Sequence, residues 1–72
     1  MTEATFAQRD DVIRLEQQLA SVRREIKIRR QVYPTRIATH RMSQRKADHE
    51  LAAMQAIEQT LLYLLDQEQA DA

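Results

Sequence analysis

The side chains that could catalyse a reaction or bind a metal are few and poorly grouped. His40 and His49 are the only histidines, and their nine-residue separation matches no common metal-binding spacing. Asp48 and Glu50 flank His49, but adjacent polar residues of this kind are ordinary on an exposed helix. Ser43 has no evident base beside it. The chain has no cysteine and no glycine, which excludes thiol chemistry, disulfides and glycine-rich phosphate loops. We therefore expect no enzyme activity, no metal and no cofactor.

Charge is the feature of the sequence that best suits a binding role. Residues 23–46 hold nine basic residues and one acid, whereas the preceding segment has four acids and two bases and the following segment six acids and no base. Arg45 and Lys46 fall in the first turn of an expected helix, and Asp66 and Glu68 in its last, against the preference of the helix dipole. Such conflicts are expected where function or assembly has a competing claim. The basic segment is either a solvated turn, a surface for acidic or amphipathic proteins, or a nucleic-acid contact.

Tyr33 beside Pro34 is a second candidate for binding. A tyrosine next to a conformationally fixed proline is a rigid, amphipathic anchor of the kind enriched in interface hot spots. Equally, Tyr33 could close the end of the core and hydrogen-bond the turn. The sequence leaves both interpretations open. The predicted partner-binding residues are Tyr33, Arg36, His40, Arg41, Arg30 and Arg45.

Hydrophobic spacing predicts a first helix over about residues 5–31. Its apolar residues recur three or four positions apart, which is typical of a coiled-coil seam: Val12, Leu15, Leu19, Val22 and Ile26. Thr5 and Gln8 fit a capping box at its start. Pro34 disfavours a helical backbone at Tyr33, so the helix should end before it.

A turn over about residues 32–43 and a second helix over about residues 44–67 complete the predicted elements. Ser43 is the expected N-cap of that helix, and Met42 and Ala47 are placed for a hydrophobic staple. The apolar stripe of the second helix is wider than the first seam, which suggests more than one neighbouring helix. The predicted core and dimer residues are Leu15, Leu19, Val22, Ile26, Leu51, Met54, Ile57, Leu61 and Leu65.

These elements predict a single all-α domain over residues 1–72, folded as a two-helix antiparallel hairpin. A chain of 72 residues is small for an independent core, so we expect a homodimer that forms a four-helix bundle. The first residues lack the pattern of a signal peptide, and the longest strongly apolar run, Leu61–Leu65, is too short to cross a bilayer. We expect a cytoplasmic protein with no membrane partner.

The segments Arg29–Pro34 and Arg41–Asp48 resemble a group of small phage and prophage proteins with a "VYP…GRM[ST]…KAD" core. The resemblance covers roughly residues 26–58 and includes no catalytic motif. Small size and two-helix layout are also similar to a phage-encoded anti-activator that binds a LuxR-type quorum-sensing regulator of its bacterial host. These resemblances imply a phage or prophage accessory protein that binds a host protein and inhibits or redirects it. The alternative is a small nucleic-acid-binding accessory protein that uses the basic turn.

The sequence departs from that phage pattern at the turn. Thr35 and Arg36 stand where an Arg-Trp pair is usual, and His40 replaces a glycine. The first departure removes an aromatic side chain from the turn or from a binding surface.

Overall fold

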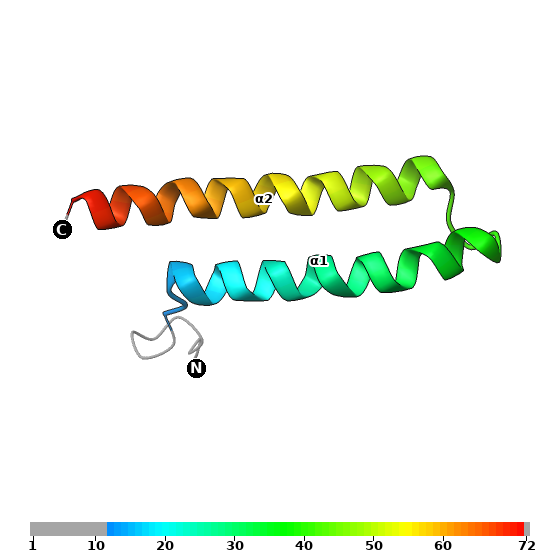
Figure 1. Ribbon diagram of the computed structural model, residues 1–72, viewed down its shortest axis with the longest axis horizontal. Coiled ribbons are helices and arrows are strands. Elements are labelled where there is room, and N and C mark those ends of the chain that lie inside the picture. The colour runs from blue at the N-terminus through cyan, green and yellow to red at the C-terminus, as the bar shows by residue number, and fades with distance from the viewer. Residues whose placement is uncertain (1–11, 72) are drawn as a thin grey trace, which may run out of the picture.

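Residues 12–71, which the computed structural model describes, form two antiparallel helices joined by a tight turn (Figure 1). Helix α1 spans Leu15–Ala38 and helix α2 spans Gln44–Ala70. At about 1.5 Å per residue the helices are roughly 36 and 40 Å long. No strand occurs in this part of the chain. The predicted all-helical hairpin is therefore confirmed.

Helix α1 begins later than the spacing predicted. Arg14 has an extended backbone (φ −74°, ψ 159°), and its N–H donates to Oε1 of Gln17 at 2.9 Å. Val12, expected in the seam, precedes the helix and is exposed. The seam of α1 thus starts at Leu15, because the Gln17 side chain caps the backbone there. The capping box expected at Thr5 lies outside the described residues.

Pro34 lies inside α1, so the prediction that this proline ends the helix near residue 31 was wrong. Proline lacks an N–H and removes one helical hydrogen bond, at a cost of about 3 kcal/mol in a helix interior. Pro34 itself is exposed, whereas Tyr33 is buried and Ile37 half-buried. Tyr33 and Ile37 line the same hollow as Ala47 of α2. The burial of these two side chains offsets the lost hydrogen bond, so α1 continues for about one turn past Pro34.

The turn between the helices covers residues 39–43 and is shorter than predicted. The N–H of His40 donates to the Ile37 carbonyl at 3.1 Å, and that of Arg41 to the Arg36 carbonyl at 2.8 Å. This pair of bonds is a Schellman motif, which needs a left-handed residue at its centre. His40 supplies it with a φ of 60°.

Helix α2 begins at Gln44, as predicted, and runs three residues past the predicted end at 67. The Ser43 side chain accepts a hydrogen bond from the Lys46 N–H at 3.0 Å. The predicted N-cap is therefore confirmed. This bond satisfies one of the backbone donors that the first turn of any helix leaves without a partner.

The core lies along the seam between the helices as layers seven residues apart. Two cross-helix ion pairs show the register of the helices: Arg23 with Glu58 and Arg29 with Glu50. Seven-residue spacing keeps successive side chains on one side of each helix. The layers that this register brings together are Leu19 with Leu61, Ile26 with Met54, and Tyr33 with Ala47; of these only Met54 is half-buried rather than buried.

One predicted core residue, Ile57, does not lie in the hairpin core, since it is 46% exposed. Ile57 follows Met54 by three residues and points about 60° further round the helix axis. A single partner helix covers only a narrow stripe of α2, so the outer part of the wide stripe stays uncovered. The other predicted core residues are buried or half-buried: Leu15, Leu19, Val22, Ile26, Leu51, Met54, Leu61 and Leu65.

Candidate functional site

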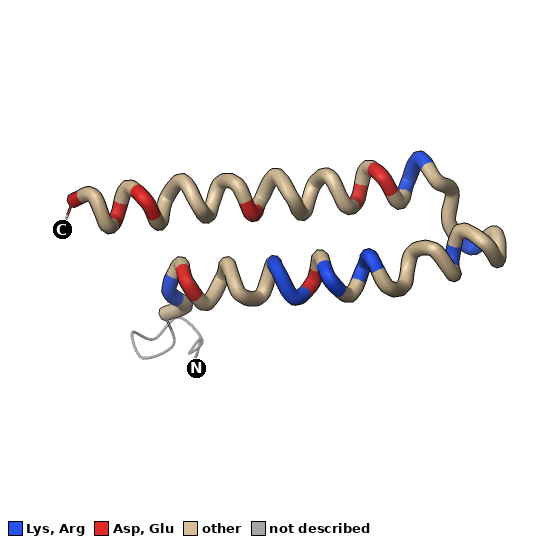
Figure 2. Tube along the Cα trace, in the orientation of Figure 1, with Lys and Arg blue, Asp and Glu red and all other residues tan. Residues whose placement is uncertain are grey.

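Basic residues lie along the middle of α1 and around the closed end of the hairpin, where the turn joins the helices (Figure 2). Arg36 lies in the last turn of α1, Arg41 in the turn and Arg45 in the first turn of α2, whereas Arg30 lies about two turns before the end of α1. We call the four exposed arginines Arg30, Arg36, Arg41 and Arg45 the basic end. The open end of the hairpin is acidic, because Asp66, Glu68 and Asp71 lie at the end of α2. The hairpin thus separates its charges along its long axis.

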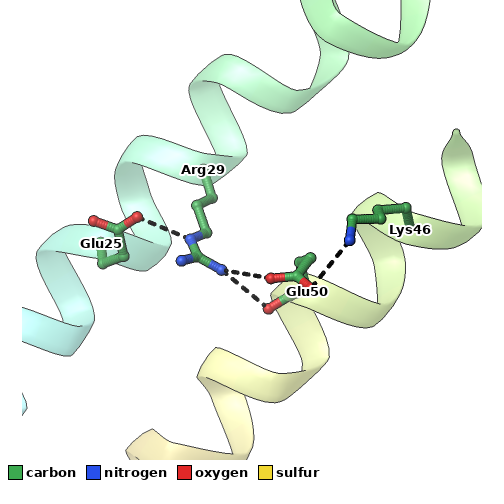
Figure 3. A network of polar contacts seen from close by, with 4 residues as sticks. All are labelled: Glu25, Arg29, Lys46 and Glu50. Atoms are coloured by element: carbon green, nitrogen blue, oxygen red, sulfur yellow. Dashed lines mark hydrogen bonds and ion pairs between the residues drawn. The ribbon is translucent and has the colours of Figure 1, made fainter. Parts of the chain in front are cut away.

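Arg29, just outside the basic end, has its charge satisfied within the hairpin (Figure 3). Its Nε lies 2.9 Å from Glu25 and its Nη1 3.5 Å from Glu50, which also has Lys46 at 3.9 Å. The hydrogen bond to Glu25 raises the pKa of Arg29, against the opposing effect of desolvation. Arg29 therefore stays charged and joins the two helices.

Arg23 is satisfied in the same way on the other edge of the seam. Its Nε donates to Oε2 of Glu58 at 2.8 Å. By contrast, none of the four arginines of the basic end forms an ion pair with another residue of the described range 12–71. Their charges are available to a partner of opposite sign.

Tyr33 is only 9% exposed and belongs to the core. Of the two interpretations that the sequence left open, its position favours the one in which it closes the end of the core. We therefore remove Tyr33 from the predicted partner-binding set. The remaining five residues, Arg30, Arg36, His40, Arg41 and Arg45, are all exposed.

His40 and Arg41 are held in place by the Schellman bonds of the turn. Thr39 adds a bond from its hydroxyl to the Thr35 carbonyl at 2.8 Å. A glycine at position 40 would adopt the positive φ of the His40 backbone at least cost and would present no side chain. Here the same backbone presents an exposed imidazole instead.

Sequence reasoning missed a groove along one side of the seam. Arg30 lines two neighbouring hollows there, of about 310 and 180 Å³. The first also contains Arg23 and Lys27, and the second contains Pro34 and the half-buried Ile37. The signal was available, because Arg23, Lys27 and Arg30 are spaced four and three residues apart and so share one side of a helix. This groove extends the basic end along α1.

Comparisons with known proteins identify no relative. No family model matches the chain, and neither a curated protein nor a solved structure matches it. Within residues 12–71 no cluster of three or more metal-binding side chains occurs, and neither helix is long and apolar enough to cross a membrane. The resemblance of residues 26–58 to small phage proteins stays a prediction.

Proposed function

We propose that this chain is a non-enzymatic binding protein that works as a homodimer and docks its basic end on an acidic or amphipathic protein surface. In the form that the phage resemblance implies, the target is a protein of a bacterial host, such as a LuxR-type regulator, which the chain inhibits or redirects in the cytoplasm. The paired hairpins form a four-helix bundle.

The observation that carries the proposal is the contrast between satisfied and available arginines. Arg23 and Arg29 are paired with carboxylates across the seam, and the four arginines of the basic end are not. The Schellman turn and the Ser43 cap fix the backbone that carries Arg41 and Arg45. Like charges held together at one end repel each other, and a partner of opposite charge relieves that repulsion.

The groove beside Arg30 favours a protein partner. It combines Lys27 and Arg30, which form no ion pair within residues 12–71, with Pro34 and Ile37. The groove can therefore take the apolar side of an acidic segment as well as its carboxylates. A phosphate backbone would use the arginines alone. Among the described residues only one aromatic side chain, Tyr33, lies near this end, and it is buried, so these residues offer no stacking surface for bases there.

Affinity capture from host lysate, with and without nuclease, tests the proposed function. Arg41→Glu should abolish capture of the target, and Arg24→Glu should leave it unchanged, since Arg24 is an equally exposed arginine of α1 far from the turn. Capture that survives nuclease and falls only modestly between low and physiological salt supports the protein partner. Loss of capture with nuclease, together with a steep salt dependence, would instead support the nucleic-acid alternative.

A further inference from the structure

Exposed apolar side chains gather on one side of the hairpin. Ile28, Ile57 and Leu64 are 44, 46 and 43% exposed, and Val32 is half-buried. We call these four residues the apolar face. Large apolar side chains exposed together on a helical surface mark an interaction site more often than isolated ones do.

The Arg29 network marks one edge of the seam (Figure 3), and the residues of the apolar face can be placed relative to it. Glu25 and Arg29 of α1 meet Glu50 of α2 across a single edge of the seam. Ile28 and Val32 line the same hollow as Glu25 and Arg29. On α2, side chains seven residues apart point within about 20° of each other, which places Ile57 and then Leu64 in line with Glu50.

The opposite side of the seam is lined by charged rather than apolar side chains. Arg23 meets Glu58 there, and Lys27 and Arg30 line the groove beside them. Tyr63 is the other large apolar side chain exposed on α2, at 63%. It lies about 100° further round the helix than Leu64. The apolar face and the basic groove therefore lie on different sides, and covering the first leaves the second open.

We infer that a second copy of this chain covers the apolar face in antiparallel orientation, with the two-fold axis near Ile57. This inference rests on the proposed homodimer and specifies its interface. Ile57 is the middle residue of α2, which spans Gln44–Ala70. A two-fold axis there sets Ile57 against its own copy, as an isologous interface requires.

Charge complementarity supports both the partner and its orientation. Lys46 precedes Ile57 by eleven residues and Glu68 follows it by eleven, and all three point to the same side of α2 within about 40°. The two-fold axis therefore brings Lys46 of one copy to Glu68 of the other, twice. A parallel arrangement would put the basic ends together and the acidic ends together. Unlike charges select the antiparallel orientation, while burial of the apolar face supplies affinity.

Sedimentation of two variants tests the face. Ile57→Asp places two carboxylates at the centre of the interface and should weaken dimerisation roughly 100-fold or more. Tyr63→Asp changes a more exposed residue of α2, about 120° from Ile57 round the helix, and should leave the dimer intact. Circular dichroism checks that both variants remain helical. A monomeric wild type would contradict the proposed homodimer itself. A wild-type dimer that survives Ile57→Asp and is broken by Tyr63→Asp would overturn the assigned face alone.

Disulfide cross-linking tests the orientation, because the natural chain has no cysteine. The double variant Lys46→Cys/Glu68→Cys should form covalent dimers under mild oxidation. Both residues lie on α2, about 33 Å apart along its axis, so they cannot join within one chain. The matched control Gln44→Cys/Asp66→Cys has the same spacing, but its residues point about 140° and 180° away from Ile57 round α2 and should stay uncross-linked. A dimer in solution that cross-links only through the control pair would overturn the arrangement.

Discussion

The closed and open ends of the hairpin differ both in how firmly they are built and in charge. At the closed end, the Schellman bonds, the Ser43 cap and the Arg29 network connect the helices. At the open end, the seam residues Leu15 and Leu65 are only half-buried. The closed end is basic and the open end acidic (Figure 2). The firmly built end is thus also the one that carries the available arginines.

This difference explains why the sequence of α2 opposes its own dipole. The first turn of α2 contains two basic residues and no acid, and its last turn contains an acid and no base. Each charge at the unfavourable end of the helix dipole costs about a few tenths of a kcal/mol. The Ser43 cap contributes about 1 kcal/mol in the opposite direction. The local cost is therefore tolerable, and under the proposed function the charge reversal serves association with other molecules.

The largest expected effect is a buried charge in the layer nearer the open end. Leu19 and Leu61 form one layer and are each 7% exposed. Leu19→Asp or Leu61→Asp replaces one of them with a buried carboxylate, at a cost of several kcal/mol. That cost exceeds the ~3–5 kcal/mol that a core of this size supplies. Circular dichroism should show loss of helix for both variants. A soluble, fully helical protein in either case would contradict the assigned layers.

Tyr33→Ala tests the corresponding layer at the closed end. Removing a buried aromatic side chain costs about 3 kcal/mol or more, so the midpoint of thermal or urea unfolding should fall sharply. Tyr63→Ala is the matched control, because Tyr63 is an exposed tyrosine of α2, and its midpoint should barely change. Unchanged stability with lost target binding would return Tyr33 to the partner-binding set.

The two cross-helix ion pairs should differ in strength. The Arg29 side chain is 23% exposed and that of Arg23 is 53% exposed. Arg29→Ala should cost about 1 kcal/mol, because it removes charge-assisted bonds to two carboxylates from a partly desolvated site. Arg23→Ala should cost less, as for a surface pair. Urea unfolding of both variants in the same buffer measures the difference in lost stability. Equal losses of stability would argue against the role of the Arg29 network in joining the two helices at the closed end.

A small gain is expected from His40→Gly. His40 has a left-handed backbone, which costs a residue with a Cβ about 1 kcal/mol relative to glycine. The gain is reduced by the greater freedom of glycine in the unfolded chain, so we expect a stabilisation of roughly 0.5 kcal/mol. A destabilised variant would show that the imidazole makes a contact of its own.

The sequence predicted which segments form helices better than it predicted where those helices begin and end. Spacing identified the seam from Leu15 to Ile26, and the hydroxyl before an apolar run identified Ser43. The continuation of α1 through Pro34 could not be predicted locally, because it depends on burial of Tyr33 and Ile37 against α2. Ile57 was predicted for the combined core and dimer set, and the spacing could not separate the two, since an apolar stripe does not show how much of it one partner helix covers.

Among the candidate site residues, sequence reasoning identified the basic end but not which arginines are available. Arg29 and Arg30 are adjacent and chemically identical, yet Arg29 pairs with carboxylates, whereas Arg30 forms no ion pair within residues 12–71 and lines the hollow beside Lys27. That distinction depends on the register between the helices, which the cross-helix ion pairs reveal only in the folded hairpin.

The central claim is that the opposite charges of the two ends govern how the hairpin associates, and the distance between spin labels at Ala70 tests it most directly. In the antiparallel dimer the acidic ends lie far apart, so two labels on Ala70→Cys should be about 35–40 Å from each other, by the rise of α2 on either side of Ile57. Each label should lie near Gln44 of the other copy, which the two-fold axis at Ile57 sets opposite Ala70. A short distance between the two Ala70 labels would establish a parallel dimer and contradict the account, as would a protein that stays monomeric at micromolar concentration.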